Sequence, residues 1–243
     1  MICWFLSQAF NAAINYYSIR AIYKTIGDQE YKSYFKELVA FSFPVALQES
    51  SFTVCHWAAV MFLTKYASAG DLGLYSAGGQ WNSIIVMVPV LLNNVVLSYL
   101  SGNISNKDQH TRTVKTMILV NFVCTFVPFV FVYIFAGLIS SFYGPTFTEL
   151  PAVLRIMTLS TIFECCTSVF KSELMSQGRT WLLFSLRFIR DVSLVLATYF
   201  VLSSAQYTNG AITYAWIGIC VATLFFIMMF AAYMFTSRHL SKE

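Results

Sequence analysis

Charged residues are scarce in this sequence. Asp, Glu, Lys and Arg make up 11% of the chain, whereas a soluble domain usually carries about 25%. Hydrophobic residues make up 58% of the 243 positions. This composition excludes an ordinary soluble domain, because the surface of a soluble domain needs more charged residues. It predicts an all-α integral membrane protein, since helices satisfy their own backbone hydrogen bonds in lipid.

Motifs of catalysis and of metal binding are also absent. The sequence has no GxSxG, Walker loop, HExxH, GxGxxG or CxxC pattern. Its three histidines are scattered, and its six cysteines lie in apolar runs. We therefore expect no catalytic residue, no metal and no cofactor, and we expect a protein that is not an enzyme. The net charge of +4 resides mainly in short loops, which gives no indication of a nucleic-acid partner.

Seven runs are apolar enough to cross a membrane, which takes about 20 residues each. They are Ile2–Tyr23, Leu38–Tyr66, Ala77–Ser101, Val114–Ile139, Leu150–Lys171, Trp181–Ser203 and Ala211–Thr236. The first run is the weakest, because polar residues interrupt it. Pro151 lies close to the first turn of the fifth run, where proline is tolerated. The connections are short, so we predict one bundle of seven transmembrane helices without a soluble domain.

Lys and Arg are concentrated in alternate loops. Eleven of the fifteen lie on the side that holds the loop between the first two runs, and three lie inside runs. The opposite side holds only Lys65. Because basic loops stay on the cytoplasmic side of a membrane, this pattern predicts a cytoplasmic C-terminus.

The third run belongs to the most distinctive stretch of the chain, Leu72–Ser101. A Gly-rich turn at Ser76–Gly79 is predicted to open it, and Pro89, Asn93 and Asn94 interrupt its apolar residues. Proline and amides inside a span are tolerated where other helices or a water-filled cavity satisfy them. We therefore expect this helix to face protein or a polar cavity.

This stretch follows the pattern G-L/Y-x-A-x-x-Q-W-x-x-x-I-x-x-x-P-x-x-L and ends in L-S. The matching residues are Gly73, Leu74, Tyr75, Ala77, Gln80, Trp81, Ile85, Pro89, Leu92, Leu100 and Ser101. The pattern resembles the second helix of the C-terminal half of Wzx-type polysaccharide flippases. These belong to the multidrug/oligosaccharidyl-lipid/polysaccharide (MOP) exporter superfamily. Elsewhere the chain matches only in the number and spacing of helices.

The resemblance implies a two-lobe exporter of which about half is present. Residues 1–26 would be the last helix of a missing N-terminal lobe, 27–36 a cytoplasmic connector, and 37–243 the C-terminal six-helix lobe. The implied function is export of undecaprenyl-diphosphate-linked oligosaccharide repeat units across the bacterial inner membrane by alternating access. The implied partners are that lipid-linked oligosaccharide, membrane lipids, and the missing lobe or a second chain.

Three other functions compete with this one. A drug or cation exporter of the same superfamily would favour carboxylates over arginines in its cavity. A membrane-embedded polysaccharide polymerase or acyltransferase usually has a large catalytic loop, and the outer loops here are short. A seven-helix receptor has only the helix count in its favour.

The sharpest candidate residues are Arg187, Arg190 and Asp191 in the sixth run. Charges inside a span are costly and are functional candidates for that reason. Spacings of three and four residues place the three on neighbouring positions of one helix face. Arg187 and Arg190 are predicted to bind a diphosphate or an acidic sugar, and Asp191 to take part in ion coupling. The alternative is an ion pair between Arg187 and Asp191, which would leave Arg190 as the better substrate ligand.

Other polar residues lie in the second, third and fifth runs. Glu49, five residues after Pro44, is predicted to bind a coupling ion or else to be hydrogen-bonded within the bundle. Asn93 and Asn94 are predicted either to bind sugar or to join helices. Glu164 is predicted to be a structural partner of Arg187 or Arg190, or a substrate ligand. Two further charges at the inner end of the fifth run, Lys171 and Glu173, are expected to be solvated.

Overall fold

The computed structural model describes residues 10, 14, 28–102, 107–204 and 209–240. For 28–34, 93–102, 107–111 and 237–240 it describes the backbone alone. The chain divides into two units, Met1–Phe43 and Pro44–Glu243. The fold described below is that of the second unit.

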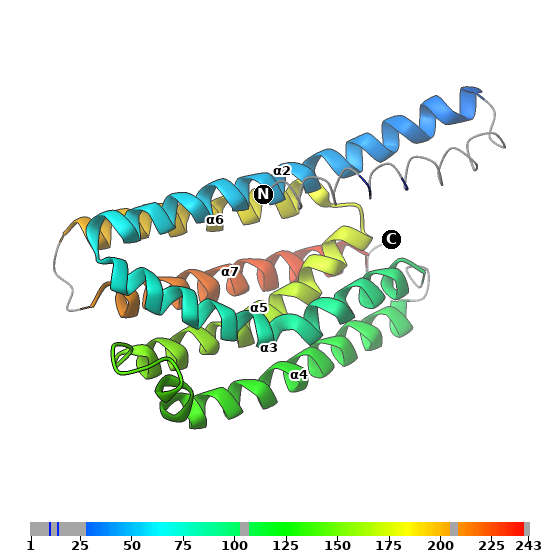
Figure 1. The fold of residues 1–243 in the computed structure, drawn as a ribbon. Helices are drawn as coiled ribbons and strands as arrows, with labels where there is room; N and C mark the ends of the chain where they lie inside the picture. The colour runs from blue at the N-terminus through cyan, green and yellow to red at the C-terminus, as the bar shows by residue number, and fades with distance from the viewer. Residues whose placement is uncertain (1–9, 11–13, 15–27, 103–106, 205–208, 241–243) are drawn as a thin grey trace. The chain divides into compact units, whose positions relative to one another are not determined.

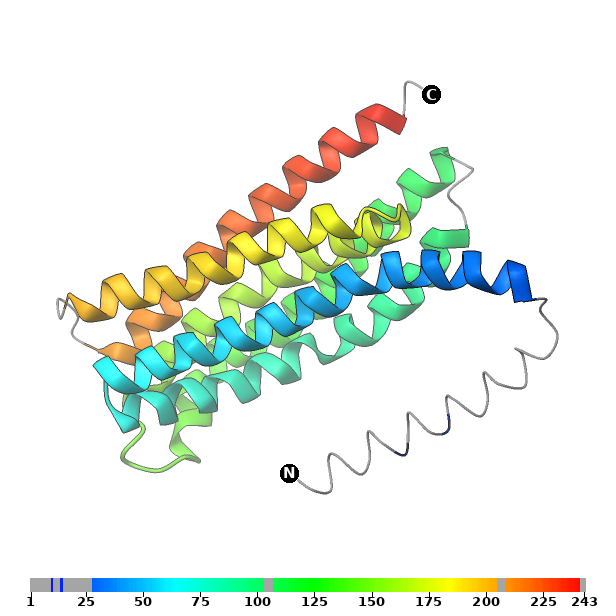
Figure 2. The same cartoon turned by 90° about the horizontal axis from the view of Figure 1, so that it is seen from above.

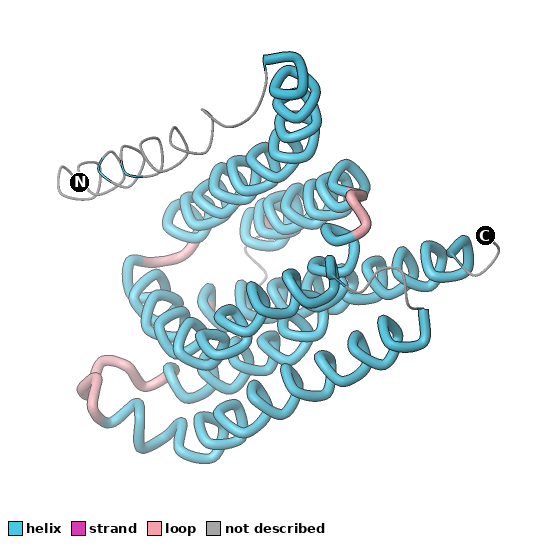
Figure 3. The backbone as a smooth tube through the Cα atoms, turned by 90° about the vertical axis from the view of Figure 1, so that its right-hand side faces the viewer, coloured by secondary structure: helices cyan, strands magenta, loops and turns pink. Residues whose placement is uncertain are grey.

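The described residues form six helices (Figure 1). They are α2 (Asp28–Tyr66), α3 (Ala69–Gly102), α4 (Lys107–Ser141), α5 (Leu150–Ser176), α6 (Thr180–Ser203) and α7 (Gly210–Leu240). Figure 3 shows helices joined by short loops, and the described residues contain no strand. The all-α class is therefore confirmed. The count of seven spans is not, because the predicted span Ile2–Tyr23 lies almost wholly outside the described residues.

The predicted domain bounds remain predictions. The expected connector at 27–36 coincides with the start of α2, which begins at Asp28 and continues without interruption to Tyr66.

Four of the described helices are long and apolar enough to cross a membrane. The qualifying segments are Phe35–Tyr66, Arg112–Ser141, Leu150–Ser176 and Gly210–Thr236. The helix α6 has 24 residues, with Arg187, Arg190 and Asp191 near its middle. These helices agree with the expected multi-pass membrane protein.

The connections α2–α3, α4–α5 and α6–α7 lie at the same end of the second unit (Figures 1 and 2). We call this the outer end, since it carries the loops that are poor in Lys and Arg. The helices α3, α5 and α7 all begin there.

The Gly-rich turn predicted at Ser76–Gly79 was wrong, because α3 already begins at Ala69. Ser68 and Asp71 form a reciprocal cap at its start: Ser68 Oγ donates to Asp71 Oδ2 at 2.7 Å, and the Asp71 amide donates to Ser68 Oγ at 3.1 Å. Such a pair satisfies amides that the first turn leaves unpaired. The glycines lie inside the helix for a packing reason: a Cβ on Gly78 would lie 2.6 Å from Met157 Sδ on α5.

The central helix of this unit is α5, which packs against α3, α4 and α7. Its first half lies in an apolar core that also includes Leu74, Ile85, Val132 and Ala211. Buried hydroxyl groups along α5 donate back to its own carbonyls, as Thr158 does to Leu154 at 2.7 Å. This arrangement satisfies polar atoms that have no access to water.

Two residues of the sequence signature fix α3 to the α4–α5 connection. Trp81 Nε1 donates to the Tyr143 hydroxyl at 3.2 Å, and that hydroxyl donates to Gln80 Oε1 at 3.5 Å. Pro151 lies in the first turn of α5, as predicted.

The outer half of α2 packs on α6 and α7. Ala59 and Leu63 of α2 share a buried cluster with Leu202 of α6 and Tyr214 of α7. Tyr75 of α3 closes the contact, with its ring centroid 4.9 Å from that of Tyr214. By contrast, α6 contacts α5 only sparsely. The charged side chains of the candidate site come from α2, α5 and α6.

Candidate functional site

The buried face of α6 carries charge. Its buried residues are Thr180, Leu183, Arg187, Asp191, Thr198 and Leu202, which recur every three or four positions. That spacing defines one stripe of an α-helix. A stripe facing the interior is normally apolar, so two charged side chains in its middle need partners within the protein.

Asp191 finds its partner on its own helix. Both Nε and Nη2 of Arg190 donate to Asp191 Oδ1, with Nε at 2.8 Å. The Asp191 side chain is 2% exposed. Its other oxygen, Oδ2, is buried and accepts no hydrogen bond from the described part of the chain. The pair expected from the four-residue spacing, Arg187 with Asp191, was wrong, because Arg187 is held by a different helix.

Glu49 of α2 is the partner of Arg187. Arg187 Nη1 donates to Glu49 Oε1 at 2.6 Å, and Lys171 Nζ of α5 donates to the same oxygen at 3.3 Å. Gln48 Nε2 donates to it as well, at 3.2 Å. One carboxylate oxygen therefore joins α2, α5 and α6. We call Glu49, Lys171, Arg187, Arg190 and Asp191 the charged cluster.

Two aromatic rings hold the arginines of the charged cluster. The Arg187 and Arg190 guanidinium carbons lie 5.6 and 5.4 Å from the centre of the Phe52 ring. Phe225 of α7 lies 5.1 Å from the Arg190 guanidinium. A cation over an aromatic face is stabilised electrostatically. Phe52 was not among the residues predicted from the sequence, although its place three residues after Glu49 puts both on one face of α2.

Glu164 of α5 and His56 of α2 lie near the charged cluster. Glu164 interacts electrostatically with Arg190, and His56 interacts electrostatically with Arg190 and Asp191. Among the described residues no ion pair joins Glu164 to Arg187 or Arg190, so its role as their structural partner stays a prediction. Glu164 is exposed even though it lies near the middle of α5. The substrate and ion-coupling roles of Arg187, Arg190, Asp191 and Glu49 also remain predictions.

The charged cluster borders an accessible space. The side chain of Glu49 is 53% exposed and that of Lys171 is 34% exposed, whereas that of Arg187 is 10% exposed. Exposed charges at this depth must meet water, a ligand or another protein surface, since lipid tails cannot solvate them.

Two expectations on nearby residues need correction. Lys171 is an ion-pair partner of Glu49 instead of a solvated side chain. Glu173 is 2% exposed, and Gln177 Nε2 donates to its Oε1 at 2.6 Å. The side chains of Asn93 and Asn94 lie outside the described residues, so their binding role stays a prediction.

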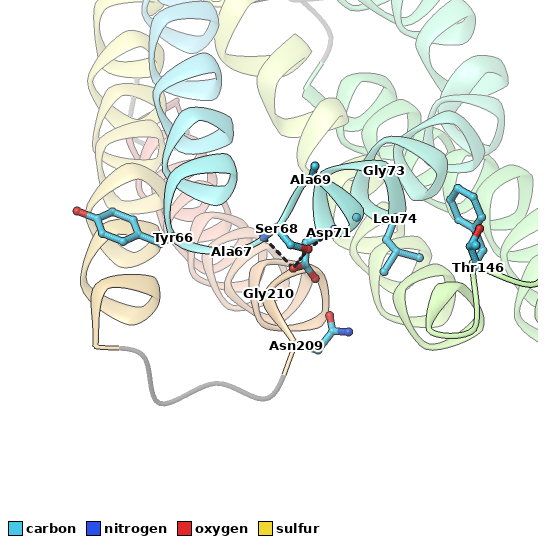
Figure 4. A pocket seen from close by; sticks show the side chains of 12 residues that line it. Tyr66, Ala67, Ser68, Ala69, Asp71, Gly73, Leu74, Thr146, Asn209 and Gly210 are labelled. Atoms are coloured by element: carbon cyan, nitrogen blue, oxygen red, sulfur yellow. Dashed lines mark hydrogen bonds between the residues drawn. The ribbon is translucent and has the colours of Figure 1, made fainter.

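A second feature lies at the outer end, in a pocket of about 590 Å³ (Figure 4). Residues of the α2–α3 turn, Thr146, Phe147 and the start of α7 line it. Besides its contacts with Ser68, Asp71 accepts a hydrogen bond from the Ala211 amide at 3.0 Å. One carboxylate thus caps both α3 and α7, and it complements the positive N-terminal ends of both helices.

In the described residues, no three side chains of His, Cys, Asp or Glu come together as ligands for a metal ion. The charged cluster holds three cations and two carboxylates.

No protein-family model matches the sequence, and no curated protein is similar to it. The crystal structure of a point mutant of a MATE protein has the same fold, with a TM-score of 0.76 and 14% sequence identity. The match covers 86% of this chain and 47% of that one, so this chain spans about half the length of the structure it resembles. The chain therefore has the fold of about half of that MATE structure.

Proposed function

We propose that this chain is part of an exporter that moves a lipid-diphosphate-linked oligosaccharide across the bacterial inner membrane. The proposal rests on one observation above all: the side chains of Lys171, Arg187 and Arg190 gather where α5 and α6 meet α2, and Lys171 and its partner Glu49 are partly exposed. The fold supports a transporter. The Wzx-type assignment rests on the sequence resemblance in α3.

A diphosphate suits this arrangement of charges. Arginine binds phosphate oxygens through two parallel N–H donors, and lysine adds a compact positive charge. Both interactions are stronger away from bulk water. The lipid tail of such a substrate would remain in the bilayer, while the cations hold the diphosphate.

The membrane, its orientation and the second half are part of the proposal. The chain would lie in the inner membrane with a cytoplasmic C-terminus, as the distribution of Lys and Arg predicts. Alternating access of this kind takes place between two lobes. The second lobe would be the missing N-terminal lobe or a second chain.

The test compares lipid binding by charge variants. The purified protein in nanodiscs of phosphatidylcholine is mixed with undecaprenyl diphosphate or undecaprenol, and bound lipid is counted by native mass spectrometry. We expect retention of the diphosphate lipid alone, and a loss of at least tenfold in Arg187→Gln and in Arg190→Gln. Arg155→Gln is the matched control, because Arg155 lies on α5 towards the outer end and contacts Tyr133. Equal retention by all variants would contradict the proposal.

A drug or cation exporter is the second candidate. Glu164, an acidic residue near the middle of α5, and the MATE fold favour it. In the same assay, this function predicts that the wild type binds tetraphenylphosphonium. Glu164→Gln should abolish that binding, and Arg187→Gln should leave it unchanged.

An enzyme such as a polymerase or acyltransferase has less support. The connections at the outer end are short: two residues between α2 and α3, eight between α4 and α5, and six between α6 and α7. A large catalytic loop has no place in them.

A further inference from the structure

We propose that Glu49 is a built-in competitor for the anion site. In this conformation its carboxylate occupies the position beside Arg187 and Lys171 that the phosphate of a substrate takes, and a bound anion displaces it. The inference rests on the proposed function, since it assigns the same cations to an anionic substrate. It adds that the Glu49 side chain occupies the anion site when no substrate is bound.

The exposures of the three side chains support this role. Glu49 is 53% exposed, while its partners Arg187 and Lys171 are 10% and 34% exposed. The carboxylate therefore lies on the accessible side of the cations, where an incoming anion would arrive. In a purely structural ion pair of the interior, both partners are usually shielded, as Asp191 is by its contact with Arg190.

The hydrogen bonds of Glu49 also resemble those of a bound ligand. Three donors, from Arg187, Lys171 and Gln48, all reach Oε1. Oε2 accepts no hydrogen bond from the described residues. A phosphate offers more acceptor oxygens than a carboxylate, so it satisfies Arg187 in bidentate fashion and leaves an oxygen for Lys171.

The position of Glu49 on α2 makes its withdrawal feasible. Lys171 lies on α5 and Arg187 on α6, so only side-chain hydrogen bonds join Glu49 to these two cations. Pro44, five residues earlier, removes one backbone hydrogen bond and favours bending of the helix at this point.

Withdrawal of Glu49 and binding of an anion must occur together. If Glu49 left alone, Arg187, whose side chain is only 10% exposed, would remain without a counter-charge, which is unfavourable. An anion that takes its place removes that cost. Withdrawal of Glu49 and binding of the anion are then linked. If only a fraction of the wild-type sites is free of Glu49, removal of the Glu49 charge raises the apparent affinity for the anion by one divided by that fraction.

The experiment measures inorganic diphosphate binding by calorimetry, with the whole chain in phosphatidylcholine nanodiscs. Glu49→Gln keeps the shape of the side chain and removes its charge. Glu149→Gln is the control: it removes the same charge at the N-cap of α5, where the Glu149 side chain makes no capping hydrogen bond. Glu149 lies 22 residues before Lys171, or about 33 Å along α5.

We expect Glu49→Gln to bind diphosphate at least tenfold more tightly than the wild type, and Glu149→Gln to bind it equally. Glu49→Asp, which keeps the charge but shortens the reach, should give an intermediate affinity, and it replaces Glu49→Gln if that variant fails to elute as the folded protein. If the wild type binds through Arg187 and neither Glu49 variant binds more tightly, this inference is overturned and the proposed function stands. If neither the wild type nor the Glu49 variants bind, both are overturned.

Discussion

Glu49 and Arg187 lie 138 positions apart in the sequence, yet Arg187 Nη1 donates to Glu49 Oε1 at 2.6 Å. The contact joins α2 to α6 near the middle of both helices. It also determines the other pairs, because it occupies the arginine that would otherwise face Asp191 one turn away. Asp191 is left to Arg190, its neighbour in the sequence.

The first prediction concerns the energy of this pair. We expect a double-mutant cycle with Glu49→Gln and Arg187→Gln to give a coupling energy of about 0.5–2 kcal/mol, since one partner is half exposed and the other shielded. The single Arg187→Gln change should cost most, because it removes the shortest of the three hydrogen bonds to Glu49 and leaves Lys171 as its one cationic partner among the described residues. The measurement is the apparent melting temperature in detergent, followed by tryptophan fluorescence.

A coupling energy of zero would show that the two residues act independently. The same cycle with Glu49→Gln and Arg155→Gln serves as the control, and we expect it to be additive.

The second prediction concerns Phe52, whose ring lies against both arginines. Phe52→Leu keeps an apolar side chain of similar size and removes the aromatic face, which is worth about 0.5–2 kcal/mol to a cation. We expect diphosphate to bind several-fold more weakly while the melting temperature changes little.

Phe62→Leu is the matched control, because Phe62 contacts Tyr66 and Tyr199 instead of a charged group. Unaltered diphosphate binding in Phe52→Leu would mean that the ring does not orient the guanidinium groups.

The third prediction concerns Asp71, which caps both α3 and α7. Asp71→Ala removes acceptors for the Ser68 and Ala211 amides, so we expect a loss of about 1–3 kcal/mol. For a chain of this size that equals a fall in melting temperature of about 2–4 °C per kcal/mol. The Ala211 amide should also exchange its hydrogen faster.

Glu149→Ala tests the same end of the protein without removing a cap, because Glu149 makes no side-chain capping bond. If both variants melt alike, Asp71 does not hold the two helix ends together.

The fourth prediction compares two adjacent glycines in α3. A Cβ on Gly78 would lie 2.6 Å from Met157 Sδ and 3.3 Å from Val153 Cγ1, whereas Gly79 has no neighbour within 4 Å. Gly79→Ala should raise stability by about 0.5–1 kcal/mol, as expected for glycine in a helix interior. Gly78→Ala should lower the melting temperature, because α5 must shift.

The double variant Gly78→Ala with Met157→Ala should be less destabilised than the sum of the two single variants, since Met157→Ala removes the nearest obstacle to the new Cβ. Equal effects of the two glycine substitutions would show that α3 and α5 do not pack closely at Gly78.

The sequence predicted the existence and order of the second to seventh helices, although α2, α3 and α4 begin 10, 8 and 7 residues before the predicted runs. Their apolar runs are long, and in lipid only a helix satisfies every backbone group over such a length. The predicted start of the fifth run and the place of Pro151 were confirmed to the residue. The sequence also located the charges of α6, because three charged residues in one span are rare.

The wrong predictions concern the glycines of α3 and the ion-pair partner of Arg187. Ser76–Gly79 was predicted as a turn because small residues often mark turns, but Gly78 serves close packing against Met157. The sequence contains no information on which face of α5 meets α3. The true start of α3 is marked by Ser68 and Asp71, whose capping pattern the sequence does contain.

The approximate positions of the helices, the helices that carry charge and the membrane character of the chain can all be read from the sequence, because each depends on local composition and period. Which charges meet depends on how the helices pack. Arg187 pairs with Glu49 and Lys171 joins the same carboxylate because α2, α5 and α6 come together there, and no spacing along the chain encodes a contact between residues of three different helices.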